Sequence, residues 1–486
     1  MTVSAQPVQR SARGATLSGS PLLLCGVLAL SAIAFWGLRI GYWSRTFEEP
    51  FSDIGDYIRV ARMIATQFTF GLPPDQMAYY TPATPGAIAI SIVLGGTQFE
   101  AVYRGMIQVL AFAAALGLAL ELGRSTRRPW LGAAFLAIVA LSRPSIFWSY
   151  KLSTEGLSEA LLMATTALAL RAIRKGSPAS AFFAGATAIL LGLNRPQYVP
   201  AALALPVLIA FSHWLMVRRS GSSMPPRLLL RVFAAGLAGL VLAWSPWIIR
   251  NYRQFDAIVP LSTTGYESFL WESGAASLGP TGYTELRLSD GEVLRQFGIR
   301  NIQRLAQRYP NEIDRRDFLG RIAAAWLREN IAYYPALVAR RLWRFIHVNG
   351  TSGLTQVPRE ALFTTLPAGA DPATGRRNVL DRILLDKSPA IVWLALAGLA
   401  MALLRRPAVA LVLACLWVTP WFMVALVVGA ERAVEPLIPA TIWLAFYGVA
   451  EAALLVWGLL RRRLSPQPQA QGQPTASLSR FVQANR

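Results

Sequence analysis

Acidic and basic side chains recur along this 486-residue chain at one predicted boundary of its apolar segments. An Asp held at a membrane surface can act as a general base, taking a proton from an attacking hydroxyl. Arginines bind a phosphate group through paired donors, and a departing phosphate needs positive charge more than it needs a general acid. The residues with these properties are Asp53, Asp56, Lys151, Glu155, Arg195, Arg250 and Arg432.

These residues combine a base with a basic cluster at the depth of lipid phosphates, which predicts group transfer from a lipid-linked phosphate to an acceptor outside the cytoplasm. Charged side chains near hydrocarbon are costly and usually face protein or water. Arg143, Glu159, Glu431 and Glu435 fall at the same boundary, so one outward-facing polar cavity would account for the whole set. The alternative is charge pairing between helix ends, for example Glu155 with Lys151.

Long apolar segments must position these residues. The chain is 54% hydrophobic and only 15% charged, which indicates a multi-pass, all-α membrane protein. A crossing takes roughly 20 helical residues. Ten crossings are expected, of which 178–192 is the shortest, at 21–40, 99–123, 130–146, 155–173, 178–192, 198–217, 228–248, 388–404, 407–429 and 436–459.

Arginine-rich links follow every second crossing, and the positive-inside rule places them in the cytoplasm. Arg10 and Arg13 place the N-terminus there as well, so ten crossings return the C-terminus to the same side. The net charge of +21 is spread over these membrane flanks, a distribution that argues against nucleic acid as a partner. It favours attraction to anionic lipid.

Two long segments lie outside the membrane in this topology. The first, 41–98, contains a predicted surface helix at 53–68 and an apolar run, 87–94, that is too short to span. The second is a helical subdomain with helices expected at 289–308, 312–330 and 335–347, the last basic and aromatic and resting on the membrane surface. The resulting division is a disordered tail 1–20, a membrane module 21–248, the outer subdomain 249–387, the last membrane helices 388–460 and a second tail 461–486.

Common catalytic templates are not found in the sequence. It contains no Walker loop, no HExxH, no Cys/His ligand spacing and no GxSxG elbow. His213 and His347 have no second ligand at a recognisable spacing, so both are expected to be structural. No metal site is predicted, although the carboxylates leave a divalent cation open as a cofactor.

Six motifs occur in an order that resembles the polytopic GT-C glycosyltransferases, over residues 50 to 450. The resemblance is to the protein O-mannosyltransferase and aminoarabinose lipid A transferase superfamily (glycosyltransferase family 39-like), including bacterial members of unassigned acceptor. The motifs are FSDIGDY, STEGLSEALL, GLNRPQY, WSPWIIRNYRQFDAIVPLSTTGY, LRENIAYYPALVARRLWRF and AERAVEPLIPA.

The resemblance implies an inverting transferase that uses a polyprenyl-phosphate sugar, with the acid of the first outer loop as base. Asp53 matches that position best, but many relatives carry an Asp-Glu pair where this chain has Ile54 after Asp53, so the base assignment stays open between Asp53 and Asp56. Glu155 corresponds to the acid of the Thr-Glu-x-Leu pattern. Arg250 matches the Arg-Asn motif, and Arg432 the arginine before Pro-x-x-Pro, where this chain lacks the usual adjacent aromatic.

The leading hypothesis is therefore an integral glycosyltransferase of a bacterial inner membrane, with its site facing the periplasm or cell exterior. Its partners would be the polyprenyl-phosphate sugar, membrane lipid and a glycan, lipid or protein hydroxyl as acceptor. A transporter or flippase for an anionic lipid is the main alternative, but it would need polar residues at mid-membrane depth and broken helices. A non-catalytic assembly subunit is a third hypothesis.

Overall fold

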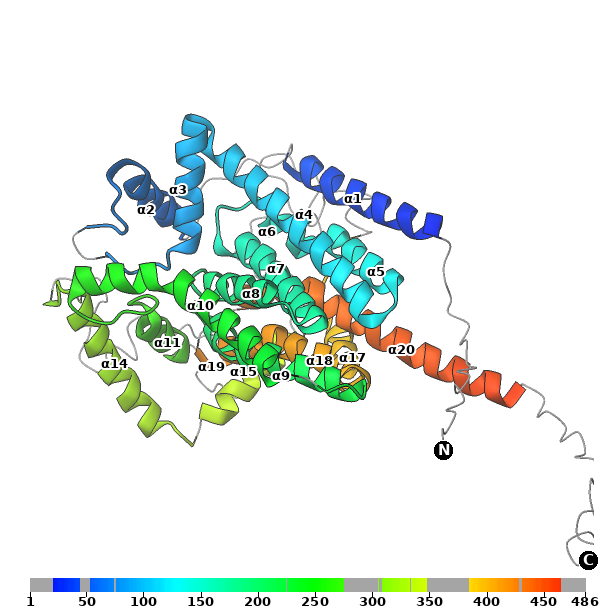
Figure 1. The fold of residues 1–486 in the computed structure, drawn as a ribbon. Coiled ribbons are helices and arrows are strands. Elements are labelled where there is room, and N and C mark those ends of the chain that lie inside the picture. Colours follow the sequence, from blue (N-terminus) through cyan, green and yellow to red (C-terminus); the bar gives the residue numbers. More distant parts are fainter. Residues whose placement is uncertain are drawn as a thin grey trace, which may run out of the picture.

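The architecture is that of a helical bundle, seen in a computed structural model (Figure 1). The structure describes residues 21–43, 53–73, 76–223, 225–274, 305, 308–332, 334–347, 384–427 and 431–464. Within these ranges the regular elements are helices, and β structure is limited to the isolated bridges Leu72–Gln76 and Ser142–Leu385. The all-α fold class is confirmed. The two predicted tails, 1–20 and 465–486, lie outside the described residues.

All ten predicted crossings are helical in the described part of the chain. Seven stretches are long and apolar enough to span a membrane. They contain α1 (Pro21–Trp43), α4 (Phe99–Thr126), α7 (Thr154–Lys175), α9 (Val199–Arg219), α10 (Pro226–Phe255), α18 with η3 and α19 (Pro407–Leu413, Ala414–Val418, Thr419–Val427) and α20 (Ile438–Leu464). Three shorter apolar helices complete the set: α5 (Pro129–Leu141), α8 (Pro178–Gly192) and α17 (Pro389–Arg405). The protein is a multi-pass membrane protein.

The predicted crossing 130–146 is interrupted. Helix α5 ends at Leu141, and α6 (Arg143–Trp148) begins after the extended residue Ser142. Pro144 has no N–H to donate to the Ala140 carbonyl and its ring clashes with that group, so α5 cannot continue through it, whereas proline fits the first turn of a new helix. Leu385 restores the lost backbone hydrogen bonds, because its N–H donates to Leu141 O (2.8 Å) and its carbonyl accepts from Arg143 N (2.8 Å).

Glycines bring three helix pairs into backbone contact. A Cβ added at Gly239 of α10 would lie 1.9 Å from the Phe182 carbonyl oxygen of α8. Comparable positions would lie 2.0 Å from backbone oxygens at Gly132, between α5 and α4, and at Gly398, between α17 and α20. Lipid supplies no hydrophobic drive between helices, so close packing across small residues must supply the association.

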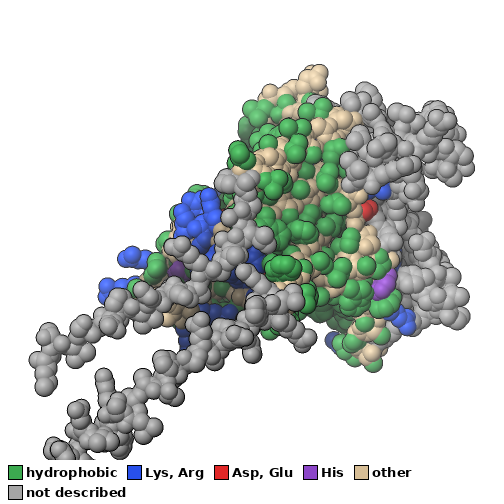
Figure 2. Space-filling model, turned by 90° about the vertical axis from the view of Figure 1, so that its right-hand side faces the viewer, with side chains coloured by type: hydrophobic (Ala, Val, Ile, Leu, Met, Phe, Trp, Pro, Cys, Tyr) green, Lys and Arg blue, Asp and Glu red, His purple; other side chains and the backbone are tan. Residues whose placement is uncertain are grey.

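The arginine-rich links meet at one end of the bundle. Glu451 of α20 pairs with Arg128 and Arg405, which follow α4 and end α17, while Glu121 pairs with Arg124 and Arg174. We call this the basic end. Figure 1 places the start of α1 and the end of α20 here, and Figure 2 shows Lys and Arg gathered along one edge of a broad hydrophobic face. These contacts place the basic links 124–128, 171–175 and 405–406 on one side.

The opposite end, which we call the site end, carries the outer segments. The first contains α2 (Ile54–Gln67), α3 (Ala83–Gly95) and η1 (Gly96–Gln98), and the second contains α11 (Gly265–Gly274), α14 (Glu312–Glu329) and α15 (Tyr334–His347). The helices predicted at 53–68, 312–330 and 335–347 are confirmed. The helix expected at 289–308 lies almost wholly outside the described residues. Short helices η2 (Pro196–Tyr198) and η4 (Glu431–Leu437) also lie on this side of the chain's topology.

Helix α11 was not predicted, although the sequence contains a signal for it. Thr264 followed by Glu267 has the spacing of a capping box, which marks the start of a helix. Helix α15 buries Leu337, Val338 and Phe345 and exposes Trp343, as its amphipathic pattern predicts. Its Arg341 is buried and donates to the Ala425 carbonyl (3.0 Å) at the end of α19.

We expect Gly239→Ala to destabilise the bundle by about 3 kcal/mol, because overpacking at a backbone contact forces α8 and α10 apart. Gly37→Ala is the matched control, since Gly37 of α1 has nothing within 4 Å of its added Cβ. The thermal midpoint of the full chain in detergent is the measurement. Equal midpoints for the two variants would contradict backbone contact between α8 and α10.

Candidate functional site

Asp53 and Asp56 lie at the start of α2. Asp53 occupies the N-cap position, but its side chain does not cap the helix, and Asp56 lies in the first turn. Asp56 uses both carboxylate oxygens: Oδ1 pairs with Arg59, and Oδ2 accepts the hydroxyl of Tyr80. The start of the helix therefore carries two carboxylates three residues apart.

Tyr79 and Tyr80 lie against these aspartates. The ring of Tyr80 contacts the rings of Tyr57 and Tyr79, at centroid distances of 5.3 and 4.9 Å. Burial raises the pKa of Tyr80, and its hydrogen bond to Asp56 and the negative charge of Asp53 raise it further. Burial likewise raises the pKa of Tyr79, helped by Glu267 and by Asp53. Both phenols thus remain neutral donors facing acidic groups.

The outer subdomain reaches the same place through two carboxylates. Glu267 of α11 accepts the Tyr79 hydroxyl (3.2 Å). Glu312, at the start of α14, accepts the backbone N–H groups of Met77 (2.8 Å) and Ala78 (3.1 Å) and the hydroxyl of Thr263. Burial raises the pKa of both carboxyls. These bonds fix the segment that carries Tyr79 and Tyr80 to the second outer loop.

Arg250, near the end of α10, contacts the first outer loop in the same region. Its guanidinium donates to the Phe70 carbonyl (2.5 Å) and to Asn251 Oδ1 (2.8 Å), and it lies over the rings of Phe70 and Trp247, at 5.5 and 5.4 Å. Glu312 acts on it electrostatically. Arg250 therefore joins the first outer loop to a membrane helix.

A second group of polar side chains, around Glu155, adjoins the region of the aspartates and tyrosines. Glu155, buried at the start of α7, pairs with Arg195, whose Nε donates to Thr154 Oγ1 (2.7 Å). Asn194 donates to the Thr154 carbonyl (2.7 Å) and to Ser158 (2.8 Å). The alternative of charge pairing is realised for Glu155, with Arg195 as the partner.

Hydrogen bonds join this inner group to the aspartates. Thr81, next to Tyr80, donates to the Asn194 carbonyl (3.1 Å), and Thr84 donates to Asn194 Oδ1 (2.6 Å). The structure thus brings Asp53, Asp56, Glu155 and Arg195 into one region and places Arg250 at its edge, tied to the loop that carries the tyrosines.

Lys151 lies in the link between α6 and α7. Its ammonium group is buried and lies 4.8 Å from the centre of the Phe147 ring. Burial lowers the pKa of Lys151 to about 8. Nearby, Trp148 donates to Glu435 of η4, and Arg39 of α1 donates to Ser145 (2.8 Å), which in turn donates to Glu159 (2.5 Å). Arg432 belongs to η4, but its side chain is outside the described part.

Sequence reasoning missed Tyr79, Tyr80, Glu267 and Glu312. The paired tyrosines between α2 and α3 were the available signal, since polar aromatics there have an apolar body and a donor to place. Among the described residues, no group of three or more His, Cys, Asp and Glu side chains could hold a metal ion. His213 bonds the Ile173 carbonyl (2.6 Å) and His347 stacks on Trp343 (3.7 Å), which are structural contacts.

Comparisons with known proteins give a weak structural likeness. No family model matches the sequence, and no curated protein matches it significantly. The apo oligosaccharyltransferase of Archaeoglobus fulgidus aligns at a TM-score of 0.46 and 15% identity, covering 92% of this chain and 53% of that one. The same enzyme with an inhibitory peptide and a dolichol-phosphate aligns at 0.48 and 15%, covering 92% and 52%. This chain thus spans about half the length of that enzyme.

We expect Glu155→Ala to destabilise the protein by about 3 to 5 kcal/mol, because it leaves the buried guanidinium of Arg195 without its counter-charge. Glu100→Ala is the control: the Glu100 side chain is 45% exposed in its pair with Arg104, so its loss costs less than about 1 kcal/mol. Thermal midpoints in detergent measure both. A wild-type midpoint for Glu155→Ala would show that the pair does not hold α7 to the α8–α9 link.

Proposed function

We propose that this protein is an inverting glycosyltransferase that moves a sugar from a polyprenyl-phosphate donor to an acceptor outside the cytoplasm. The observation that carries the proposal is the convergence of Asp53, Asp56, Tyr79 and Tyr80 on the Glu155–Arg195 pair at the end of the bundle opposite the basic links. The resemblance of its motifs to GT-C transferases supports the same reading. In this orientation the protein lies in a bacterial inner membrane with the site end facing the periplasm or cell exterior.

Asp53 is the base in this mechanism. It takes the proton of the acceptor hydroxyl, whose oxygen attacks the anomeric carbon of the sugar while the bond to the lipid phosphate breaks. The electron pair of that bond leaves with the phosphate. Asp53 is assigned as the base because it best matches the acid of the first outer loop in the GT-C transferases that the motifs resemble. Asp56 accepts hydrogen bonds from Arg59 and Tyr80 through its two oxygens, which suits it to orient Tyr80.

The departing phosphate requires positive charge, and four residues are proposed to supply it: Lys151, Arg195, Arg250 and Arg432. Arg195 and Arg250 are fixed in place by Glu155, Thr154 and the Phe70 carbonyl. Donors fixed in this way stabilise developing charge without reorganising. Lys151 adds an ammonium group on a flexible stem, which can follow the phosphate as it leaves.

The outer subdomain shapes acceptor choice in this proposal. Glu312 and Glu267 hold the tyrosine segment from the second outer loop, so the position of Tyr79 and Tyr80 depends on where that loop docks. An acceptor that binds the outer loop would thereby act on the aspartate region. A glycan, a lipid or a protein hydroxyl could each serve as the nucleophile.

We expect Asp53→Asn to reduce product formation by at least about 100-fold while leaving membrane insertion intact, because the amide cannot accept the proton. The readout is mass spectrometry of lipid-linked sugars and envelope glycans in cells that lack the protein and carry either variant. Asp256→Asn is the control, since Asp256 is an exposed Asp at the same end. Full product with Asp53→Asn would remove Asp53 from catalysis, and lipid headgroup movement without any covalent product would favour a flippase.

A pH dependence follows from Lys151. Because burial lowers its pKa to about 8, the ammonium is charged below that pH and neutral above it. We expect affinity for polyprenyl phosphate to fall about tenfold between pH 7 and 9.5, since the second pKa of a phosphate ester is about 6 and the lipid's charge stays constant there.

Binding of polyprenyl phosphate to the purified chain, measured over this pH range, tests the assignment. Lys151→Arg should remove the fall, because the guanidinium stays charged. Lys175→Arg, an exposed lysine at the basic end, should keep it. If Lys151→Arg shows the wild-type pH profile, another group titrates and Lys151 does not contact the phosphate.

A further inference from the structure

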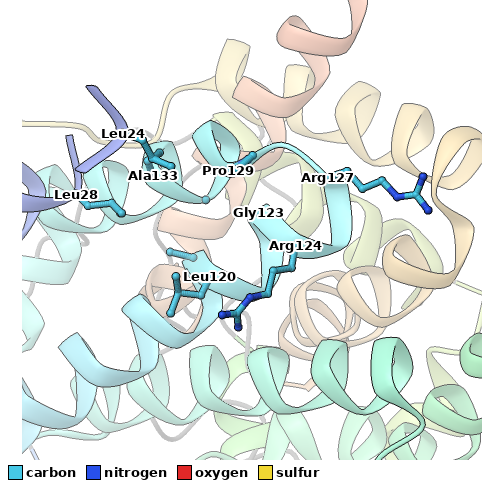
Figure 3. Close-up of a pocket in the computed structure, with 10 residues that line it drawn as sticks. Leu24, Leu28, Leu120, Gly123, Arg124, Arg127, Pro129 and Ala133 are labelled. Atoms are coloured by element: carbon cyan, nitrogen blue, oxygen red, sulfur yellow. The ribbon is translucent and has the colours of Figure 1, made fainter. Parts of the chain in front are cut away.

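An apolar cavity lies at the basic end, far from the candidate site. It has a volume of about 350 Å³ and is enclosed by α1, α4 and α5. Figure 3 shows Leu24 and Leu28 of α1 at the left with Ala133 of α5 beside Leu24, Pro129 of α5 to their right and Leu120 of α4 below. Arg124 and Arg127, at the end of α4, complete the lining.

Glycines explain why a hollow exists here. A Cβ at Gly132 would lie 2.0 Å from the Ala119 carbonyl oxygen, and one at Gly123 would lie 3.2 Å from Pro129 Cα, so α4 and α5 touch through their backbones. Glycine leaves no side chain to fill the space above that contact. The first half of α1 lies over it with Leu24 and Leu28 facing the cavity, while Leu22, Leu23 and Leu30 are more than 60% exposed. The result is an apolar hollow between α1 and the α4–α5 contact.

Positive charge collects at the mouth of this cavity. The carboxylate of Glu121 is shared by two guanidiniums, those of Arg124 (3.1 Å) and Arg174 (2.8 Å), which leaves one positive charge in excess. Arg127 adds another. Figure 3 shows the Arg124 guanidinium beside Leu120, while Arg127 extends away from the leucines. An anion bound at the mouth would therefore meet net positive charge.

The backbone at Arg127 is unusual. This residue takes the left-handed conformation (φ 58°) as the C-cap of α4, a position that favours glycine. An arginine there is disfavoured by its backbone geometry alone. The positive-inside prediction for this link already accounts for an arginine at this position, and its exposed side chain lines the cavity.

Depth separates the apolar and charged parts in the manner of a phospholipid. Leu120 lies one helical turn inside Arg124, about 6 Å along the axis, and Leu28 lies one turn inside Leu24 on α1. The acyl chain of a lipid would occupy the leucine level while its phosphate reached the arginine level. We propose that this cavity binds an anionic phospholipid of the leaflet at the basic end, with one acyl chain between α1, α4 and α5 and the phosphate at the mouth, where the exposed side chains of Arg124 and Arg127 are free to turn toward it.

Photo-crosslinking of the full chain in detergent tests the site. The probe is phosphatidylglycerol with a diazirine in one acyl chain, and labelled peptides are mapped by mass spectrometry. We expect label on residues 22–30 and 118–124, about tenfold above a phosphatidylcholine probe with the same chain, because each basic residue near the surface favours an anionic headgroup. Equal labelling by the two lipids would overturn the headgroup assignment.

Two pairs of variants separate the apolar and charged parts. Leu28→Trp fills the cavity and should abolish labelling, whereas Leu30→Trp, which changes a residue 67% exposed on the same helix, should keep it. Arg124→Gln with Arg127→Gln should lower phosphatidylglycerol labelling to the phosphatidylcholine level, whereas Arg218→Gln with Arg219→Gln should not. Unchanged labelling in Leu28→Trp, or in the Arg124 and Arg127 double variant, would refute the site.

Discussion

The buried ion pair between Glu155 and Arg195 is the interaction on which the site end depends. It joins the start of α7 to the link between α8 and α9, and the neighbouring Asn194 carries the connection outward to Thr81 and Thr84. Burying two charges is costly, and mutual attraction alone does not always offset it. Here Thr154 adds a charge-assisted hydrogen bond to Arg195 (2.7 Å), and three chain segments are fixed by one polar cluster. The position of Tyr80, and through it of Asp56, follows from that cluster.

Close helix packing separates the site end from the basic end. Along the bundle, three helix pairs meet through glycine and backbone atoms, so the helices approach closely. Close approach also fixes their relative positions, because a packed interface deforms little. Polar side chains are consequently concentrated at the two ends, where water and headgroups can satisfy them. The side chains at the site end are therefore attached to a rigid set of helices, and a precise arrangement of site residues requires such a support.

Hydropathy and the placement of arginines predicted most of this fold, because each depends on a short stretch of sequence. A membrane-crossing helix needs an apolar stretch of a given length, and the side of the membrane on which a link lies depends on the positive charges of that link. The break at Ser142 was missed although Pro144 is a local signal for it, because the hydrogen bonds that satisfy the broken backbone come from Leu385, about 240 residues away along the chain. The partner of Glu155 escaped for the same reason: Lys151 is near in sequence, but Arg195 is near in space. The contact of Glu312 with Met77 and Ala78 could not be predicted from the sequence. Its carboxylate accepts backbone N–H groups, which almost every residue has, so the partner residues carry no recognisable pattern.

Arginines at the two ends of the bundle have different contacts, and the difference matches the roles proposed for them. At the basic end, Glu121 and Glu451 each serve two guanidiniums, so positive charge stays in excess and attracts anions without fixing one geometry. At the site end, Arg195 is fixed by Glu155 and Thr154, and Arg250 by the Phe70 carbonyl and two aromatic rings. Excess charge suits exchangeable lipids, whereas oriented donors suit a single charge that develops at one place during a reaction. In the proposed function, the same residue type would attract lipid at the basic end and stabilise the departing phosphate at the site end.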